Sequence, residues 1–104
     1  MRQGEIWVNK ALAGKLIEDD NGYHFSYSAE YLKAKGAVQV SLTLPLQAET
    51  FHSDNLFPFF DGLIPEGWLL EIAHKNWKIN PRDRMGLLLT TCGDCIGNIS
   101  VKEV

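Results

Sequence analysis

The stretch that decides the fold lies in the second half of the chain and reads Phe59-Phe60-Asp61-Gly62-Leu63-Ile64-Pro65-Glu66-Gly67-Trp68. It holds five large apolar side chains together with two glycines and a proline, which fits neither a plain strand nor an uninterrupted helix. A proline disfavours helical backbone at the residue before it and is itself favoured in the first turn of a helix. The stretch therefore predicts a corner, where one helix ends and a second begins at Pro65.

Before the corner, the sequence predicts three antiparallel strands joined by short turns. The Asn21-Gly22 pair indicates a type I′ hairpin turn, because both central residues of that turn need positive φ. An earlier tight turn is expected at Asn9-Lys10. The strands are rich in β-branched, aliphatic and aromatic residues and are expected at Glu5–Val8, Leu12–Ile17 and Tyr23–Tyr27.

A short helix and a further extended segment are expected next. Ser28 can cap a helix that runs through Lys35, with Gly36 as the left-handed residue after its end. Residues Ala37–Leu46 then alternate in character, which predicts a strand with one apolar side. That side would carry Val38, Val40, Leu42 and Leu44, and Pro45 would close the strand. Gln47–His52 is expected to be a polar connection.

The second half is predicted to be mainly helical. A helix capped by Ser53, or alternatively by Asn55, should run to about Leu63, and Pro58 requires either a late start or an irregular first turn. Further helices are expected over Pro65–Lys78 and from Asn80-Pro81 to about Thr91, followed by a strand at Ile96–Val101. The pattern predicts an α+β fold: one small domain over residues 1–104, with a mostly antiparallel sheet and about three to four helices packed on it.

Composition excludes several classes of function. The chain has 104 residues, 45% hydrophobic and 22% charged, with a net charge of −3, as in an ordinary globular protein. Its basic residues are scattered, so direct binding of nucleic acid is not expected. The apolar runs are too short to cross a membrane, and the first residues lack the apolar core of a signal peptide. We therefore expect a cytoplasmic protein.

No enzyme signature stands out among the reactive residues. Cys92 and Cys95 form a single C-x-x-C pair without a βαβ context, which favours two reduced, inert thiols over redox chemistry or metal binding. The histidines show no metal-ligand spacing and are expected at the surface. The acids Asp61, Glu66 and Glu71 are more typical of helix caps and dipole partners than of an acid–base pair. No metal and no cofactor are predicted.

The candidate for function is the corner itself. On the predicted helix after Pro65, Trp68 falls about 40° outside the buried arc, beside Glu71 and Lys75. The alternative is that Trp68 folds over the core as a lid. A protruding tryptophan is a side chain enriched in binding hot spots, so the predicted partner-binding residues are Pro65, Glu66, Gly67, Trp68, Glu71 and Lys75.

Three segments together resemble the N-terminal subdomain of HipA-type toxin kinases. They are Ser41-Leu42-Thr43-Leu44-Pro45-Leu46, Phe59-Phe60-Asp61-Gly62-Leu63-Ile64-Pro65, and Leu87-Leu88-Leu89 with Gly93-Asp94 and Gly97. The resemblance covers essentially the whole chain. The kinases continue with nucleotide-binding and catalytic segments that this sequence lacks, so the resemblance implies a protein that is not itself an enzyme.

A free-standing version of this subdomain looks like HipS, the small component of three-part HipBST toxin–antitoxin systems. The resemblance implies an antitoxin that binds and inhibits a separate HipT-like Ser/Thr kinase, in a ternary complex with the DNA-binding HipB-like protein. The corner from Pro65 to Trp68 would then lie at the kinase active site. Two alternatives are an assembly adaptor between kinase and HipB-like protein, without inhibition, and a small redox or metal protein that uses Cys92 and Cys95.

Overall fold

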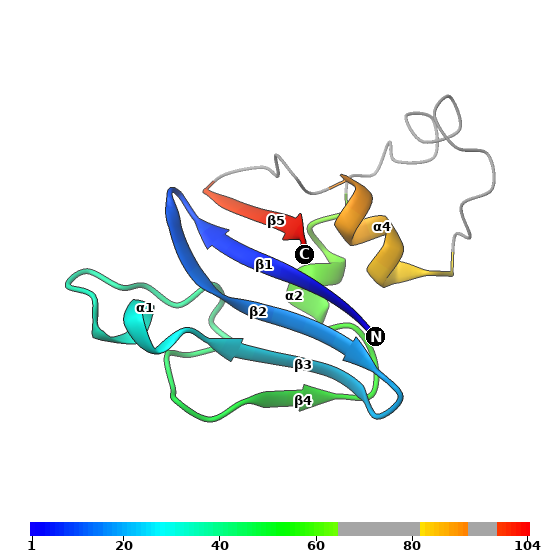
Figure 1. The fold of residues 1–104 in the computed structure, drawn as a ribbon, viewed down its shortest axis with the longest axis horizontal. Helices are drawn as coiled ribbons and strands as arrows, with labels where there is room; N and C mark the ends of the chain where they lie inside the picture. Colours follow the sequence, from blue (N-terminus) through cyan, green and yellow to red (C-terminus); the bar gives the residue numbers. More distant parts are fainter. Residues whose placement is uncertain (65–81, 92–97) are drawn as a thin grey trace.

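The fold is known from a computed structural model, which describes residues 1–64, 82–91 and 98–104. Five strands form one sheet in the order β4-β3-β2-β1-β5, and every neighbouring pair is antiparallel (Figure 1). The elements are β1 Arg2–Val8, β2 Ala11–Asp19, β3 Gly22–Tyr27, α1 Ala29–Lys33, β4 Phe51–Ser53, α2 Pro58–Asp61, α4 Arg84–Thr91 and β5 Ile99–Glu103. The predicted α+β class with an antiparallel sheet is confirmed.

The first three strands form the predicted meander, but the second turn differs in type. Asp19 pairs with Gly22 across β2 and β3, so the residues between them, Asp20 and Asn21, are the centre of the turn. Gly22 has φ of 115°, whereas Asn21 is not among the described residues with positive φ. The expected type I′ turn centred on Asn21-Gly22 is therefore wrong. The glycine supplies its left-handed backbone one position later, where the strand resumes.

One face of the sheet forms the floor of the hydrophobic core. Along β1 every second side chain points to this face, where Ile6 and Val8 are buried. Phe25 of β3 is fully buried and packs against Tyr27 and Phe51, with ring centroids 4.9 and 6.2 Å apart. The alternation follows from the pleat of a strand, which sends successive side chains to opposite faces.

The opposite face of the sheet carries a more polar set of side chains. Trp7 of β1 lies there, and the ammonium group of Lys102 sits 5.0 Å from the centroid of its ring. Glu5 and Lys102 are paired across β1 and β5. His24 of β3 lies on the same face because it alternates with the buried Phe25.

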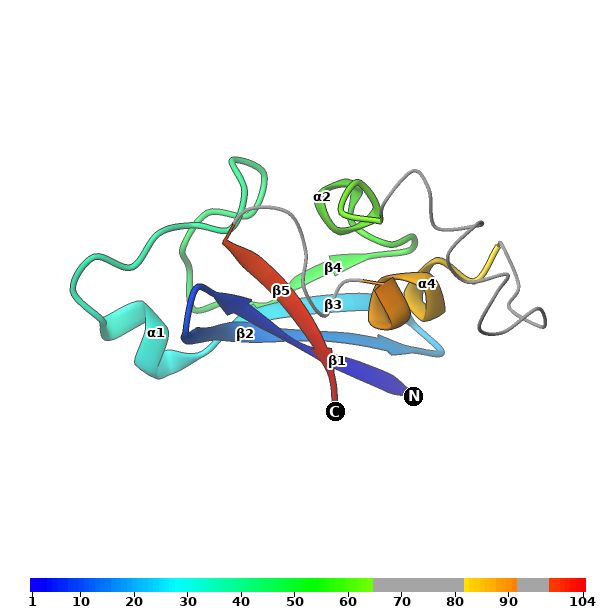
Figure 2. The same ribbon diagram turned by 90° about the horizontal axis from the view of Figure 1, so that it is seen from above.

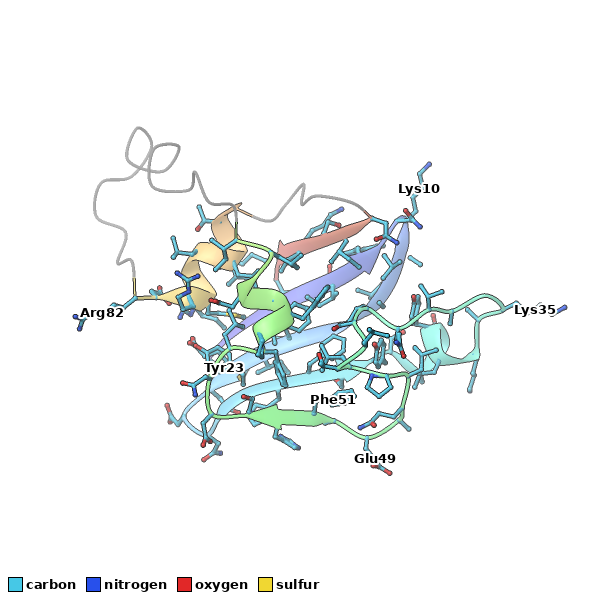
Figure 3. The ribbon with its side chains drawn as sticks, turned by 180° about the vertical axis from the view of Figure 1, so that it is seen from behind. Lys10, Tyr23, Lys35, Glu49, Phe51 and Arg82 are labelled. Atoms are coloured by element: carbon cyan, nitrogen blue, oxygen red, sulfur yellow. The ribbon has the colours of Figure 1, made fainter. Side chains whose placement is uncertain are left out.

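Two short helices, α2 and α4, cover the apolar face. Figure 3 shows them in front of the sheet, with the labelled Tyr23 and Phe51 lying on the sheet face and Lys10, Lys35 and Arg82 pointing outward from the molecule. Phe60 of α2 is fully buried, and its ring lies 5.3 Å from that of Phe25. In the part of the chain that the structure describes, no helix is both long and apolar enough to cross a membrane.

Helix α2 shows how Pro58 is accommodated. The helix begins at Pro58, with Phe57 at the N-cap and no side-chain cap. Proline fits the first helical position because its missing N–H would have no partner there in any case. The predicted alternative of a late start is confirmed, and Ser53 and Asn55 are not caps of this helix. Helix α4 likewise begins at Arg84, three residues later than expected from Asn80-Pro81.

Helix α1 lies at the opposite end of the sheet from α4 (Figures 1 and 2). The hydroxyl of Ser28 accepts from the Tyr31 amide at 3.0 Å, which confirms the predicted N-cap. The helix ends at Lys33, two residues early. Gly36 has the expected positive φ of 80°, but it serves a turn closed by the Ala37 amide on the Ala34 carbonyl.

The predicted strand over residues 37–46 is wrong. This segment forms a loop with one isolated bridge between Ser41 and Leu44. Its side chains do not alternate as expected, because Val40 and Leu44 are buried while Val38 and Leu42 are 51% and 88% exposed. The strand that pairs with β3 is instead β4, in the stretch that was expected to be a polar connection.

Two tyrosines of the core hold this loop in place. The Tyr27 hydroxyl donates to the Leu44 carbonyl and accepts from the Val40 amide at 3.0 Å. The Tyr31 hydroxyl donates to the Val38 carbonyl at 2.7 Å and accepts from its amide at 3.2 Å. Backbone groups that would bond to a neighbouring strand are satisfied by side chains instead, so the segment needs no place in the sheet. Burial raises the pKa of Tyr27.

Replacing Tyr27 by Phe should destabilise the protein by about 1–3 kcal/mol, because the Val40 amide and the Leu44 carbonyl are left unsatisfied next to the core. Urea unfolding monitored by circular dichroism measures the change. Tyr23→Phe is the matched control. Its lost hydroxyl bonds to Glu18, which stays bonded to Arg2, so we expect a smaller loss. Equal losses in the two variants would contradict the role assigned to Tyr27.

Candidate functional site

The predicted partner-binding residues lie outside the described part of the chain. This holds for Pro65, Glu66, Gly67, Trp68, Glu71 and Lys75, and also for His74 and the Cys92–Cys95 pair. Their roles therefore stay predictions. The structure does describe the two places where the segment of residues 65–81 joins the core.

The first of these places is the end of α2. Ile64, the residue before Pro65, is buried, and Phe60 one turn earlier is fully buried. The Ile64 amide donates to the Asp61 carbonyl at 3.2 Å, so the chain leaves the helix in a closed turn. The residues that lead up to Pro65 are therefore anchored in the core.

The second place is the start of α4, which is bound to the first strand. Asp83 accepts from the Gly86 amide at 3.1 Å and so caps the helix. Arg2 donates from Nη1 and Nη2 to the two carboxylate oxygens of Asp83, at 2.8 and 2.6 Å, and from Nε to Glu18 at 2.7 Å. A planar guanidinium fits this two-pronged contact. A Cβ on Gly86 would lie 2.3 Å from the Asp83 carboxylate, so the cap requires a glycine there.

The Arg2 contact changes the chemistry of Asp83. The hydrogen bonds from Arg2 hold the pKa of the Asp83 carboxyl below its ordinary value, against the opposing effect of burial. Arg2 itself stays charged, because its pKa is raised by the same carboxylate. Asp83 is therefore an ionised helix cap at neutral pH.

The two places are joined directly. Asp61 of α2 accepts from Nε of Arg84 in α4 at 2.5 Å. Beside this ion pair lies a groove of about 450 Å³, with Asp54 and Arg82 among its lining residues. The groove carries charges of both signs, which suits a protein surface better than a nucleic acid backbone. Asp61, considered from sequence as an acid–base candidate, has a structural contact here.

The structure also brings together a pair of histidines that the sequence analysis separated. His24 in β3 lies opposite His52 in β4, and their Nδ1 atoms are 2.6 Å apart. Asp19 accepts from Nε2 of His24 at 2.9 Å. One indication of this pairing was present in the sequence, because Phe51-His52-Ser53 and Tyr23-His24-Phe25 both have an aromatic residue followed by a histidine. Three residues are too few, however, to show the period of a strand.

The fold and its comparisons define the family. A family model described as the HipA N-terminal domain matches residues 4–102. An uncharacterised protein of Haemophilus influenzae is 34% identical over 103 residues, covering 99% of this chain and 93% of that protein. A solved structure described as the N-terminal domain of HipA toxin superposes with a TM-score of 0.74 at 31% identity, covering 100% of this chain and 93% of the other. The chain belongs to the HipA N-terminal domain family.

A longer relative shows the domain within a kinase. The putative kinase Y4mE of Sinorhizobium fredii is 28% identical over 97 residues, which are 92% of this chain but only 23% of that protein. The chain thus resembles the N-terminal subdomain of HipA and not its kinase domain. Together the matches confirm the predicted family and support a HipS-like protein.

The Arg2–Asp83 contact predicts a pH-dependent stability. A carboxyl whose pKa is lowered by folding stabilises the native state above its unfolded pKa, near 3.8, and this contribution is lost as the pH falls through the lower folded value. Asp83→Asn should therefore be less stable than wild type at pH 7, and the difference should shrink below pH 4 or so. Chemical unfolding at a series of pH values measures it.

Arg2→Gln serves as the partner variant in a double-mutant cycle. We expect it to be destabilised as well, and the double variant should lose clearly less than the two single losses added together. Fully additive losses, or a difference that persists unchanged at pH 2, would contradict the coupling between Arg2 and Asp83.

The Asp61–Arg84 pair should contribute little to stability. Its side chains are 43% and 37% exposed, and exposed ion pairs contribute about 1 kcal/mol or less. Asp61→Asn should therefore lower the free energy of unfolding by less than about 1 kcal/mol. Phe60→Ala should cost about 3–5 kcal/mol, because it empties a fully buried site. Denaturant titration compares the two, and a larger loss for Asp61→Asn would contradict this ranking.

Proposed function

We propose that this chain is an antitoxin of the HipS type, which binds a separate HipT-like Ser/Thr kinase toxin and inhibits it. The observation that carries the proposal is the contrast in coverage between two relatives. The match accounts for 93% of the Haemophilus protein but for 23% of the putative kinase. The same domain thus occurs both as nearly a whole protein and as one part of a kinase. A domain that occurs next to a kinase domain in one chain can also bind a kinase domain that is part of another chain.

The proposed contact surface is the corner of Pro65, Glu66, Gly67 and Trp68, continued by Glu71 and Lys75. Trp68 acts as the anchor, placed at the active site of the kinase, and the charged residues form its rim. Two features of the described residues support this choice. The chain enters the corner from the buried Ile64, and it returns to α4, which is tied to α2 by Asp61 and Arg84. Anchoring a contact surface at both ends lowers the conformational entropy that is lost on binding.

The charge on the described surface fits a protein partner. The net charge is −3, and the groove between α2 and α4 carries both acidic and basic side chains. Nothing in this distribution favours DNA, so contact with an operator in a ternary complex would fall to the HipB-like protein. In that complex the chain binds the kinase, and the HipB-like protein binds the DNA.

The test begins with the reading frames next to the one that encodes this chain, where the proposal expects a HipT-like kinase. That kinase is assayed with this chain in the absence of the HipB-like protein. Wild-type protein should inhibit phosphorylation at near-stoichiometric concentration. Trp68→Ala should raise the inhibitory concentration at least ~30-fold, because a hot-spot tryptophan contributes more than ~2 kcal/mol.

Leu42→Ala is the matched control, since Leu42 is also a large apolar side chain, 88% exposed, on the loop between α1 and β4. It should inhibit like wild type. Unchanged inhibition by Trp68→Ala would show that Trp68 is not the anchor. A kinase that binds the chain without losing activity would overturn inhibition and favour the adaptor between kinase and HipB-like protein.

A further inference from the structure

A compact set of three side chains lies on the sheet face opposite the core, at the edge formed by β3 and β4. His24 and His52 are directly opposed, their rings meet edge to face with centroids 4.8 Å apart, and their Nδ1 atoms are 2.6 Å apart. The proposed antitoxin activity makes no use of this set. It is built on paired strands and not on a loop.

The hydrogen bonds fix which ring nitrogen of His24 is available. A carboxylate can only accept, so Nε2 of His24 must carry the proton that it donates to Asp19 at 2.9 Å. In neutral His24 the lone pair is then on Nδ1, which faces His52. Two Nδ1 atoms only 2.6 Å apart must share a proton. Because Nδ1 of His24 carries the lone pair, the proton is on Nδ1 of His52.

This is the arrangement by which proteins prepare a histidine for a metal ion. A ligating histidine usually donates its other ring N–H to a carboxylate, which fixes the tautomer and makes the free nitrogen more basic. Asp19 is held for this role, because its Oδ1 also accepts from the Asn21 amide at 2.8 Å.

We propose that His24 and His52 form a binding site for a divalent transition-metal ion of the class that prefers imidazole, such as Zn²⁺, with Asp19 as the positioning residue. The ion replaces the proton shared between the two Nδ1 atoms. On binding, neutral His52 moves its proton from Nδ1 to Nε2, so that both Nδ1 lone pairs face the ion. No proton is released in that exchange.

The geometry requires only a small adjustment. Zinc–imidazole bonds of about 2.0–2.1 Å in a tetrahedral arrangement place two nitrogens about 3.3 Å apart, roughly 0.7 Å more than the present separation of 2.6 Å. His52 is exposed on a three-residue strand, and rotation of its side chain can supply this distance.

The site offers two protein ligands. Among the described residues, no group of three or more His, Cys, Asp and Glu side chains is arranged around one ion, so water fills the other coordination positions. Such a site binds less tightly than a closed structural zinc site. It would link the short edge strand β4 to β3 and add to the three residue pairs that join them.

Isothermal titration of the purified chain with ZnCl₂ at pH 7.5 tests the proposal. We expect saturable binding of one ion per chain, together with shifts of the imidazole signals of His24 and His52 in NMR spectra. His52→Gln, a change at an exposed position, should abolish saturable binding. Asp19→Asn should keep the stoichiometry and weaken affinity about 10–100-fold.

Two control variants separate this site from other ligands in the chain. His74→Gln should bind as wild type does. Cys92→Ser combined with Cys95→Ser should also bind as wild type, whereas loss of binding in that double variant would assign the ion to the cysteines and overturn the proposal. Absence of saturable binding to wild type, or unchanged binding to His52→Gln, would overturn it as well.

Discussion

The contact between Phe25 and Phe60 joins the two halves of this molecule. Phe25 comes from β3 of the sheet and Phe60 from α2, both are fully buried, and their ring centroids are 5.3 Å apart. The antiparallel sheet has one apolar face that water would otherwise reach, and covering it with helices is the main source of stability available to a domain of this size. The positions of α2 and α4, and of the segment between them, follow from this requirement.

Polar contacts then determine the orientation of the helices, which apolar burial alone does not. Hydrophobic burial has no direction, so Phe60 alone does not determine the angle at which the helices lie. Arg2 holds the first turn of α4 through Asp83, and Arg84 in the next position reaches Asp61 at the end of α2. The chain on either side of the predicted binding corner is thereby oriented from both ends.

Sequence alone predicted the parts of the fold that have a strong local pattern. It predicted the meander, the Ser28 cap of α1 and the late start of α2 at Pro58, because each of these depends on a few neighbouring residues. The strand expected over residues 37–46 was wrong, since Tyr27 and Tyr31 satisfy its backbone from a distance and Leu42 is left exposed. Strand β4 was missed because three residues carry too little periodicity.

The candidate site was predictable only in part for the same reason. The corner at Pro65 stays a prediction from local rules for proline and helix ends, and the family resemblance supplied its proposed partner. Arg2 and Asp83 are separated by 81 positions, and no local pattern reveals such a contact. The pairing of His24 with His52 likewise depends on the register of a strand that the sequence did not indicate.

The pairing of β1 with β5 has a consequence for how the molecule is made. Gly4 lies opposite Glu103, so a central strand of the sheet obtains its second neighbour from the far end of the sequence. Contacts between residues so distant along the chain form slowly, because a long loop must close before they contribute. On the ribosome, β1 can pair with β2 early, but its other edge stays open until β5 has left the exit tunnel. During synthesis that edge is a place where a neighbouring nascent chain can pair by mistake.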